Sequence, residues 1–234
     1  MRQSLHSRKS GLSQLQQVQK AILSLKPISY YPLDDSSYIA HDVMNRQNLV
    51  YPSVNVLRQP SLFASGEGSS VLFNYADPQL VGNYNFTRFS MGGITKINGD
   101  LRNRLFGVGL SISNQRAEIE CLIGSLSFSA TGRHIVGHSG FVSFYNNSSV
   151  LLEVGRSYFI CMTYQSSVFK ILLNGVPIIN VNTAGSTNVT TARQNTFYFG
   201  NEGGVPASNL NLSNVFVCDY VITEAQINNI IGLI

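Results

Sequence analysis

Short segments whose apolar residues recur at every second position make up most of the chain from residue 28 onward. In one such segment, Ile119, Cys121 and Ile123 are separated by Glu120 and Leu122. A two-residue period is typical of β-strands, because successive side chains of a strand point to opposite faces. This pattern restricts the chain to a fold built mainly from strands.

One pair of segments carries the clearest hairpin signal. The mostly apolar stretches 169–173 and 176–179 are joined by Asn174 and Gly175. Asn-Gly readily adopts the positive φ angles of a type I′ turn, which connects antiparallel strands. Asn98 and Gly99 indicate a second turn of this kind.

Further strands are expected at roughly 70–75, 84–91, 105–113, 196–200 and 212–221. Many short strands with Gly, Asn and Ser between them predict an all-β fold, a two-sheet antiparallel sandwich of the jelly-roll kind. The chain then ends in a short helix, which Thr223 caps and whose Ile227 and Ile230 face inward.

Residues 1–26 have a helical period instead. Five apolar residues follow one another at spacings of three or four, namely Leu12, Leu15, Val18, Ile22 and Leu25. Pro27 ends this amphipathic helix, and Ser10 or Ser13 caps it. The sequence therefore divides into a helical segment, 1–26, and a β-sandwich domain, 27–234.

A helix this short is marginal in water, so its apolar side must pack on something. One interpretation is that it docks on its own domain. The other is that the five apolar residues are assembly residues, which attach the chain to copies of itself and to other proteins.

Composition excludes several classes of protein. Charged residues make up 12% of the 234 positions, about half the usual share of roughly 25%, and such a neutral surface is commoner in extracellular and virion proteins. The net charge of +4 is spread along the chain, which argues against nucleic acid as a partner. No apolar run reaches the roughly 18 residues that membrane insertion requires.

Cysteine usage favours synthesis in a reducing compartment. The three cysteines, Cys121, Cys161 and Cys218, are an odd number, and each lies in an apolar stretch. A disulfide scaffold would be denser and even in number, so three buried thiols are expected. The N-terminal MRQSLHSRKSGLSQ has no apolar stretch behind it, so it is not read as a secretory signal.

The C-terminal half resembles the laminin-G-like, concanavalin A-like lectin/glucanase superfamily. Four segments carry the resemblance: 152–164, the Asn174-Gly175 hairpin, 197–201 and 212–227. It is strongest over 150–232, and segments near 28–35, 68–73 and 116–123 match the family's earlier strands. The resemblance implies a concanavalin A-like sandwich, but this fold hosts lectins, adhesins, hydrolases and structural modules.

One departure bears on function. The family often has Trp in the strand where this chain has Ser157 and Tyr158, and the chain contains no Trp. Lectins often stack sugars on aromatic rings, preferably Trp, so sugar binding is an alternative here and not the first expectation.

Glu118 and Glu120 are the only close pair of carboxylates on a predicted strand, and they share one face. Retaining glycosidases use two carboxyl groups about 5–5.5 Å apart. Glycoside hydrolases of this superfamily carry Glu-x-Asp-x-x-Glu on such a strand, whereas this chain has neither the Asp nor the final Glu. Two solvent-facing or interface glutamates are therefore expected, and no cofactor or enzymatic activity.

The sequence contains two groups of candidate metal ligands. The first group supplies the oxygen ligands that Ca²⁺ prefers and consists of Asp34, Asp35 and Asp42, with Asn45 and Asn48. Asp and Asn residues also form ordinary turns, and turns are the first expectation here. His134 and His138 lie four apart in a loop-to-strand segment, where a zinc site would need a third ligand; they are expected to be polar loop residues.

These observations together favour a virion component of the bacteriophage type, such as a head decoration, fibre or tail protein. It would be made in the host cytoplasm, assemble as an oligomer through 1–26 and project its sandwich outward, with host glycan as a further partner. The alternative is an extracellular lectin or adhesin module. A degenerate glycosidase that uses Glu118 and Glu120 is the third hypothesis.

Overall fold

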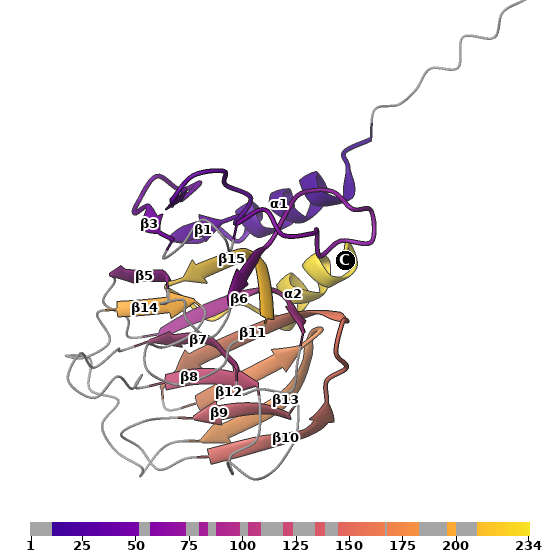
Figure 1. Ribbon diagram of the computed structural model, residues 1–234. Coiled ribbons are helices and arrows are strands. Elements are labelled where there is room, and N and C mark those ends of the chain that lie inside the picture. Colours follow the sequence, from indigo (N-terminus) through magenta and orange to yellow (C-terminus); the bar gives the residue numbers. More distant parts are fainter. Residues whose placement is uncertain are drawn as a thin grey trace, which may run out of the picture.

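The computed structural model describes residues 11–51, 57–73, 80–83, 88–98, 103–108, 119–123, 134–138, 145–166, 168–182, 196–199 and 210–234. Two antiparallel sheets face each other in this part of the chain (Figure 1). The all-β, two-sheet sandwich predicted from the sequence is confirmed, and so is the amphipathic helix that precedes it.

The first sheet has seven strands in the order β1-β15-β6-β11-β12-β13, with β4 also paired to β15. Its strands are β1 (Ser29–Tyr31), β4 (Val71–Phe73), β6 (Arg88–Ile97), β11 (Ser157–Gln165), β12 (Val168–Leu173), β13 (Val176–Asn182) and β15 (Leu210–Cys218).

The second sheet has six strands in the order β10-β9-β8-β7-β14-β5. They are β5 (Leu80–Asn83), β7 (Asn103–Val108), β8 (Ile119–Ile123), β9 (His134–His138), β10 (Tyr145–Leu151) and β14 (Thr196–Phe199). A small ribbon of β2 (Ile39–Ala40) and β3 (Leu49–Val50) lies beside the edge strand β5.

The main core fills the space between the two sheets. The seven-stranded sheet contributes Phe89, Met91 and Ile160, and the six-stranded sheet contributes Phe197 and Phe199, all buried. Each of these strands alternates between this core and the opposite face, as the two-residue period of the sequence requires.

A second core covers the outer face of the seven-stranded sheet. There α1 (Gln14–Ser24) and α2 (Glu224–Ile231) pack over Ile94, Phe159 and Phe216 (Figure 1). Thr223 caps α2, and Ile227 and Ile230 are buried, as predicted. None of the described helices is long and apolar enough to span a bilayer.

The start of α1 is fixed by a capping box. The Ser13 hydroxyl accepts a hydrogen bond from the backbone N–H of Gln16, and the Gln16 side chain accepts one from the backbone N–H of Ser13. Ser13 rather than Ser10 is therefore the cap; Ser10 lies outside the described residues. At the other end, the Tyr220 hydroxyl donates to the carbonyl of Leu25, where the helix stops before Pro27.

Of the two predicted Asn-Gly turns, one is confirmed and one is wrong. Asn174 and Gly175 have φ angles of 46° and 78°, and they join the paired strands β12 and β13. Asn98 follows β6, which pairs with β11 and β15 in the seven-stranded sheet, while β7 belongs to the other sheet. β6 and β7 therefore do not pair as a hairpin, and Gly99 itself lies outside the described residues.

The three cysteines are buried free thiols, as expected. Burial raises the pKa of Cys218 to about 12, and it raises the pKa of Cys161 well above its ordinary value. Both therefore stay protonated and act as small apolar side chains.

Among the described residues, the buried Thr95 hydroxyl in β6 has no hydrogen-bond partner. Desolvating an unpaired hydroxyl costs free energy, so Thr95→Val should raise the free energy of unfolding by about 1 kcal/mol. Thr95→Ser, which keeps the hydroxyl and removes a methyl group, should lower it by about 1 kcal/mol. Urea unfolding measures both, and a Val variant less stable than the parent chain would contradict the account.

Candidate functional site

The register of the six-stranded sheet assembles one row of residues from six different strands. Tyr198 of β14 pairs with Val81 on one side and Gly107 on the other. Gly107 pairs with Glu120, Glu120 with His138, and His138 with Tyr145. Directly paired residues of an antiparallel sheet share a face, so the row lies on one face of the sheet.

That face is turned away from the core between the sheets. Phe197 and Phe199, which flank Tyr198, are core residues, as are Phe106 and Val108, which flank Gly107. Strand alternation therefore places Tyr198 and the row it belongs to on the outer face of this sheet.

Gly107 makes room for Tyr198. A Cβ atom at Gly107 would overlap the phenol ring of Tyr198, so that ring lies across the backbone of β7. Tyr198 is fully buried although it lies on the outer face. Glycine in a strand interior often marks such a close approach.

The structure brings together Glu120 and His138, which the sequence places in two different groups of candidate residues. Glu118 lies outside the described residues. His134 pairs with Leu151 at the far end of β9, whereas His138 pairs with Glu120. Both histidines belong to a strand rather than to a loop. In the sequence, Glu120 and His138 belong to separate candidate sites. No local pattern indicates Gly107, Tyr198 or Tyr145, because the register between strands cannot be read from one short segment.

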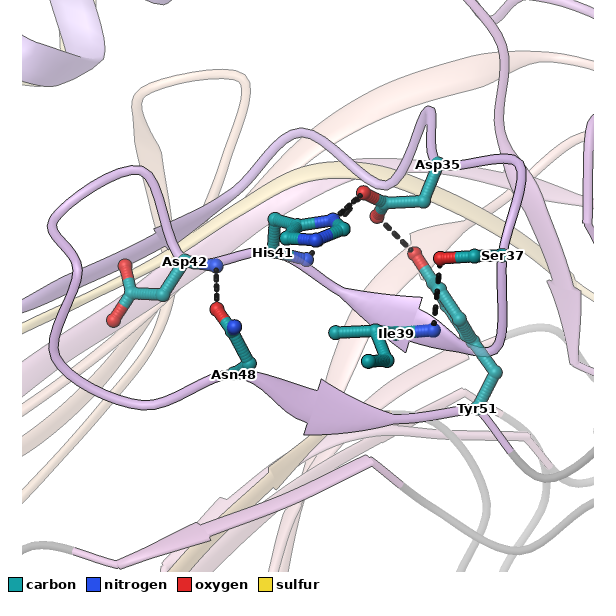
Figure 2. Close-up of polar contacts among 7 residues, drawn as sticks. All are labelled: Asp35, Ser37, Ile39, His41, Asp42, Asn48 and Tyr51. Atoms are coloured by element: carbon teal, nitrogen blue, oxygen red, sulfur yellow. Dashed lines mark hydrogen bonds and ion pairs between the residues drawn. The ribbon is translucent and has the colours of Figure 1, made fainter.

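The segment that supplied the calcium candidates forms a compact polar loop instead. The Asp42 carboxylate is buried and accepts hydrogen bonds from four backbone N–H groups: those of Tyr30 and Met44 at 2.9 and 3.0 Å, and those of Arg46 and Gln47 at 3.3 and 3.2 Å. The Asn48 side chain accepts from the backbone N–H of Asp42 (Figure 2). This is the turn-forming role that the sequence favoured.

A second carboxylate of this loop, that of Asp35, also has hydrogen-bond partners. Asp35 lies 2.7 Å from Nδ1 of His41 and accepts the Tyr51 hydroxyl at 2.9 Å (Figure 2). Burial, with the charge of Asp35, raises the pKa of Tyr51, so this phenol stays a donor. Burial and then Asp35 also raise the pKa of the neighbouring Asp34. In the part of the chain that the structure describes, no three His, Cys, Asp or Glu side chains are grouped to hold a metal ion.

These contacts predict that Asp42 stabilises the loop as an acceptor of N–H groups. Asp42→Ala should lower the free energy of unfolding by about 3 kcal/mol, because buried donors lose a charged partner. Glu153→Ala, at a carboxylate that is 70% exposed and lies outside this loop, should change it by less than about 0.5 kcal/mol. We also expect the unfolding midpoint to be the same in millimolar Ca²⁺ and in EDTA. A midpoint raised by Ca²⁺ would show that the segment binds the ion.

The predicted assembly residues divide into buried and accessible positions. Val18, Ile22 and Leu25 are buried in the second core of their own chain, while Leu15 is partly buried and packs against that core. Leu12 is 48% exposed. Burial of the last three of these five residues is what docking on the chain's own domain requires. Assembly through this segment stays a prediction.

The fold and the row of residues define an antiparallel β-sandwich with a polar and aromatic strip on one sheet. No known family model matches the chain, and no curated protein sequence is similar enough to count as a relative. Similar folds are found among solved structures at low sequence identity, and this likeness shows the fold alone.

For two of the similar structures, the match covers only part of a longer chain. A sialidase from Trypanosoma rangeli has a TM-score of 0.69 and 14% identity, over 87% of this chain and 32% of its own. The receptor binding domain of botulinum neurotoxin C/D mosaic serotype has a TM-score of 0.62 and 11% identity, over 88% of this chain and 51% of its own. The chain thus spans about a third of the sialidases' length.

A third similar structure is matched along nearly its whole length. It is domain 4 of AbnA, an extracellular arabinanase from Geobacillus stearothermophilus, in complex with arabinotriose. The TM-score is 0.61 and the identity 12%, over 87% of this chain and 97% of that domain.

These similarities correct one prediction from the sequence. The chain was expected not to be an enzyme, but six of the similar structures are sialidases, which are enzymes, and a seventh is part of an arabinanase. The fold therefore occurs within enzymes, and the expectation of a non-enzymatic protein is contradicted.

Proposed function

We propose that this chain is a glycan-binding β-sandwich domain whose binding surface is the outer face of the six-stranded sheet. The observation that carries the proposal is the row in which Glu120 and His138 are adjacent, with Tyr145 next to His138.

The residue types of this row suit a saccharide. Carboxylate and imidazole groups exchange hydrogen bonds with sugar hydroxyls, and tyrosine combines an apolar ring with a polar tip. A strip that draws one residue from each strand is also rigid, because the sheet fixes the spacing of about 4.8 Å between neighbours. The match to arabinanase domain 4, which is bound to arabinotriose, supports this choice.

The proposal predicts that the full chain binds an oligosaccharide. We would screen a glycan array that includes arabinotriose and sialylated glycans, and then titrate the best ligand by calorimetry. Glu120→Gln and His138→Ala should each weaken binding about tenfold, the effect of losing one charge-assisted hydrogen bond. Glu153→Gln is the matched control, since Glu153 is an exposed glutamate outside this sheet, and it should bind like the parent chain. No binding across the array, or parental binding by the Glu120→Gln variant, would contradict the proposal.

The virion role remains a hypothesis from the sequence. No phage protein is among the similar structures named above, and its argument depended on assembly through 1–26, where Val18, Ile22 and Leu25 are buried in the chain's own core. The laminin-G-like resemblance likewise stays a prediction, as do the virion and extracellular locations.

A further inference from the structure

A cavity of about 400 Å³ opens on the outer side of the seven-stranded sheet, the side that does not face the six-stranded sheet. It lies where residues 61–64, the start of β11, the β12–β13 turn and the end of the chain meet. Its volume is within the range of about 300–1,000 Å³ that small-molecule sites usually have.

Part of the cavity lining is apolar, and this part is called its floor below. Leu62 and Phe63 line it from the segment before β4, Phe159 from β11, and Ile231 and Ile234 from the C-terminal end. Leu62, Phe63 and Phe159 belong to the second core, so this floor is part of a packed structure and is formed in advance of binding.

The rim of the cavity carries a positive charge. Arg156 has the charged side chain among the described residues that line it. Its guanidinium lies 5.5 Å from the centre of the Tyr158 ring, and its Nη1 lies 3.2 Å from Oε1 of Glu153. The contact with Tyr158 helps to hold the cation beside the cavity.

The ion pair between Arg156 and Glu153 is weak. The Arg156 and Glu153 side chains are 58% and 70% exposed, and ion pairs so open to solvent contribute little to stability. Arg156 therefore already binds a carboxylate that a stronger competitor can displace. Arginine also suits a planar carboxylate, because its N–H groups match the two oxygens.

We propose that this cavity binds an amphipathic carboxylate, whose apolar chain packs on Leu62, Phe63 and Phe159 and whose carboxylate replaces that of Glu153 on Arg156. The site lies on the other sheet from the proposed glycan surface, and its ligand is of another chemical class.

The test uses octanoate as the probe and 1-octanol as its uncharged counterpart, titrated into the full chain and followed by calorimetry and NMR. Octanoate should bind saturably at one site, about tenfold more tightly than octanol. Arg156→Gln should remove this difference. Glu153→Gln should instead strengthen octanoate binding, because it removes the competing carboxylate. Lys20→Gln, at an exposed lysine on α1, controls for the loss of one positive charge and should leave binding unchanged.

Three results would overturn the proposal: no saturable binding of octanoate, equal affinity for octanoate and octanol, or an Arg156→Gln variant that keeps the parental preference. Because both Arg156 and Glu153 are exposed, neither substitution should unfold the chain, and thermal melts of each variant check this. Glycan binding is measured separately, so failure of one proposal leaves the other standing.

Discussion

Replacing Gly107 by alanine is expected to lower the free energy of unfolding by about 3 kcal/mol, although only one methyl group is added. The new Cβ would overlap the phenol ring of Tyr198, which is fully buried. The ring has little room to move, because packed interiors contain few voids. Urea unfolding would measure this loss of stability, provided that the free energy of unfolding falls with urea concentration at the same slope in both proteins.

The same substitution also tests the proposed glycan surface. Gly107 pairs with both Tyr198 and Glu120, so a displaced ring should shift the strand beside Glu120 and weaken glycan binding under conditions where the variant is still folded. In a Tyr198→Leu background, where the clashing ring is absent, Gly107→Ala should cost less than about 1 kcal/mol. If Gly107→Ala lowered the free energy of unfolding equally in both backgrounds, overlap with the Tyr198 ring would not be the cause of the loss.

Replacing Ile22 by alanine is expected to lower the free energy of unfolding by about 3 kcal/mol, within the range for truncating a buried isoleucine. Ile22 is fully buried in the second core, where α1 covers the seven-stranded sheet. Leu23 is the next residue of the same helix but is 38% exposed, so Leu23→Ala should change stability by less than about 0.5 kcal/mol.

This comparison separates the two roles predicted for the N-terminal helix. If α1 packs on its own domain, the thermal midpoint of the parent chain and of both variants should be independent of protein concentration. If Ile22 were instead buried between copies of the chain, the midpoint would rise with concentration, because association stabilises the folded state. Light scattering of the parent chain, with Leu12→Ala as a variant at the exposed end, tests assembly directly.

The sequence by itself determined the local features of this protein. The strand period, the Asn174-Gly175 turn and the Thr223 cap all follow from residues that interact with neighbours only a few positions away. Such interactions have the same geometry in many proteins, so a short pattern is sufficient to predict them. The buried free thiols followed equally from their apolar surroundings.

Only the tertiary structure decided which distant residues meet. The Asn98 turn was wrong because β6 and β7 belong to different sheets, and the pairing of Glu120 with His138 depends on the register of β8 and β9. A shift by one residue would move every side chain of a strand to the other face, and register is set by packing of the whole sheet rather than by any one segment. The Asp42 carboxylate shows the same limit: the sequence favours a turn there over a calcium site, but only the fold places four backbone N–H groups around it.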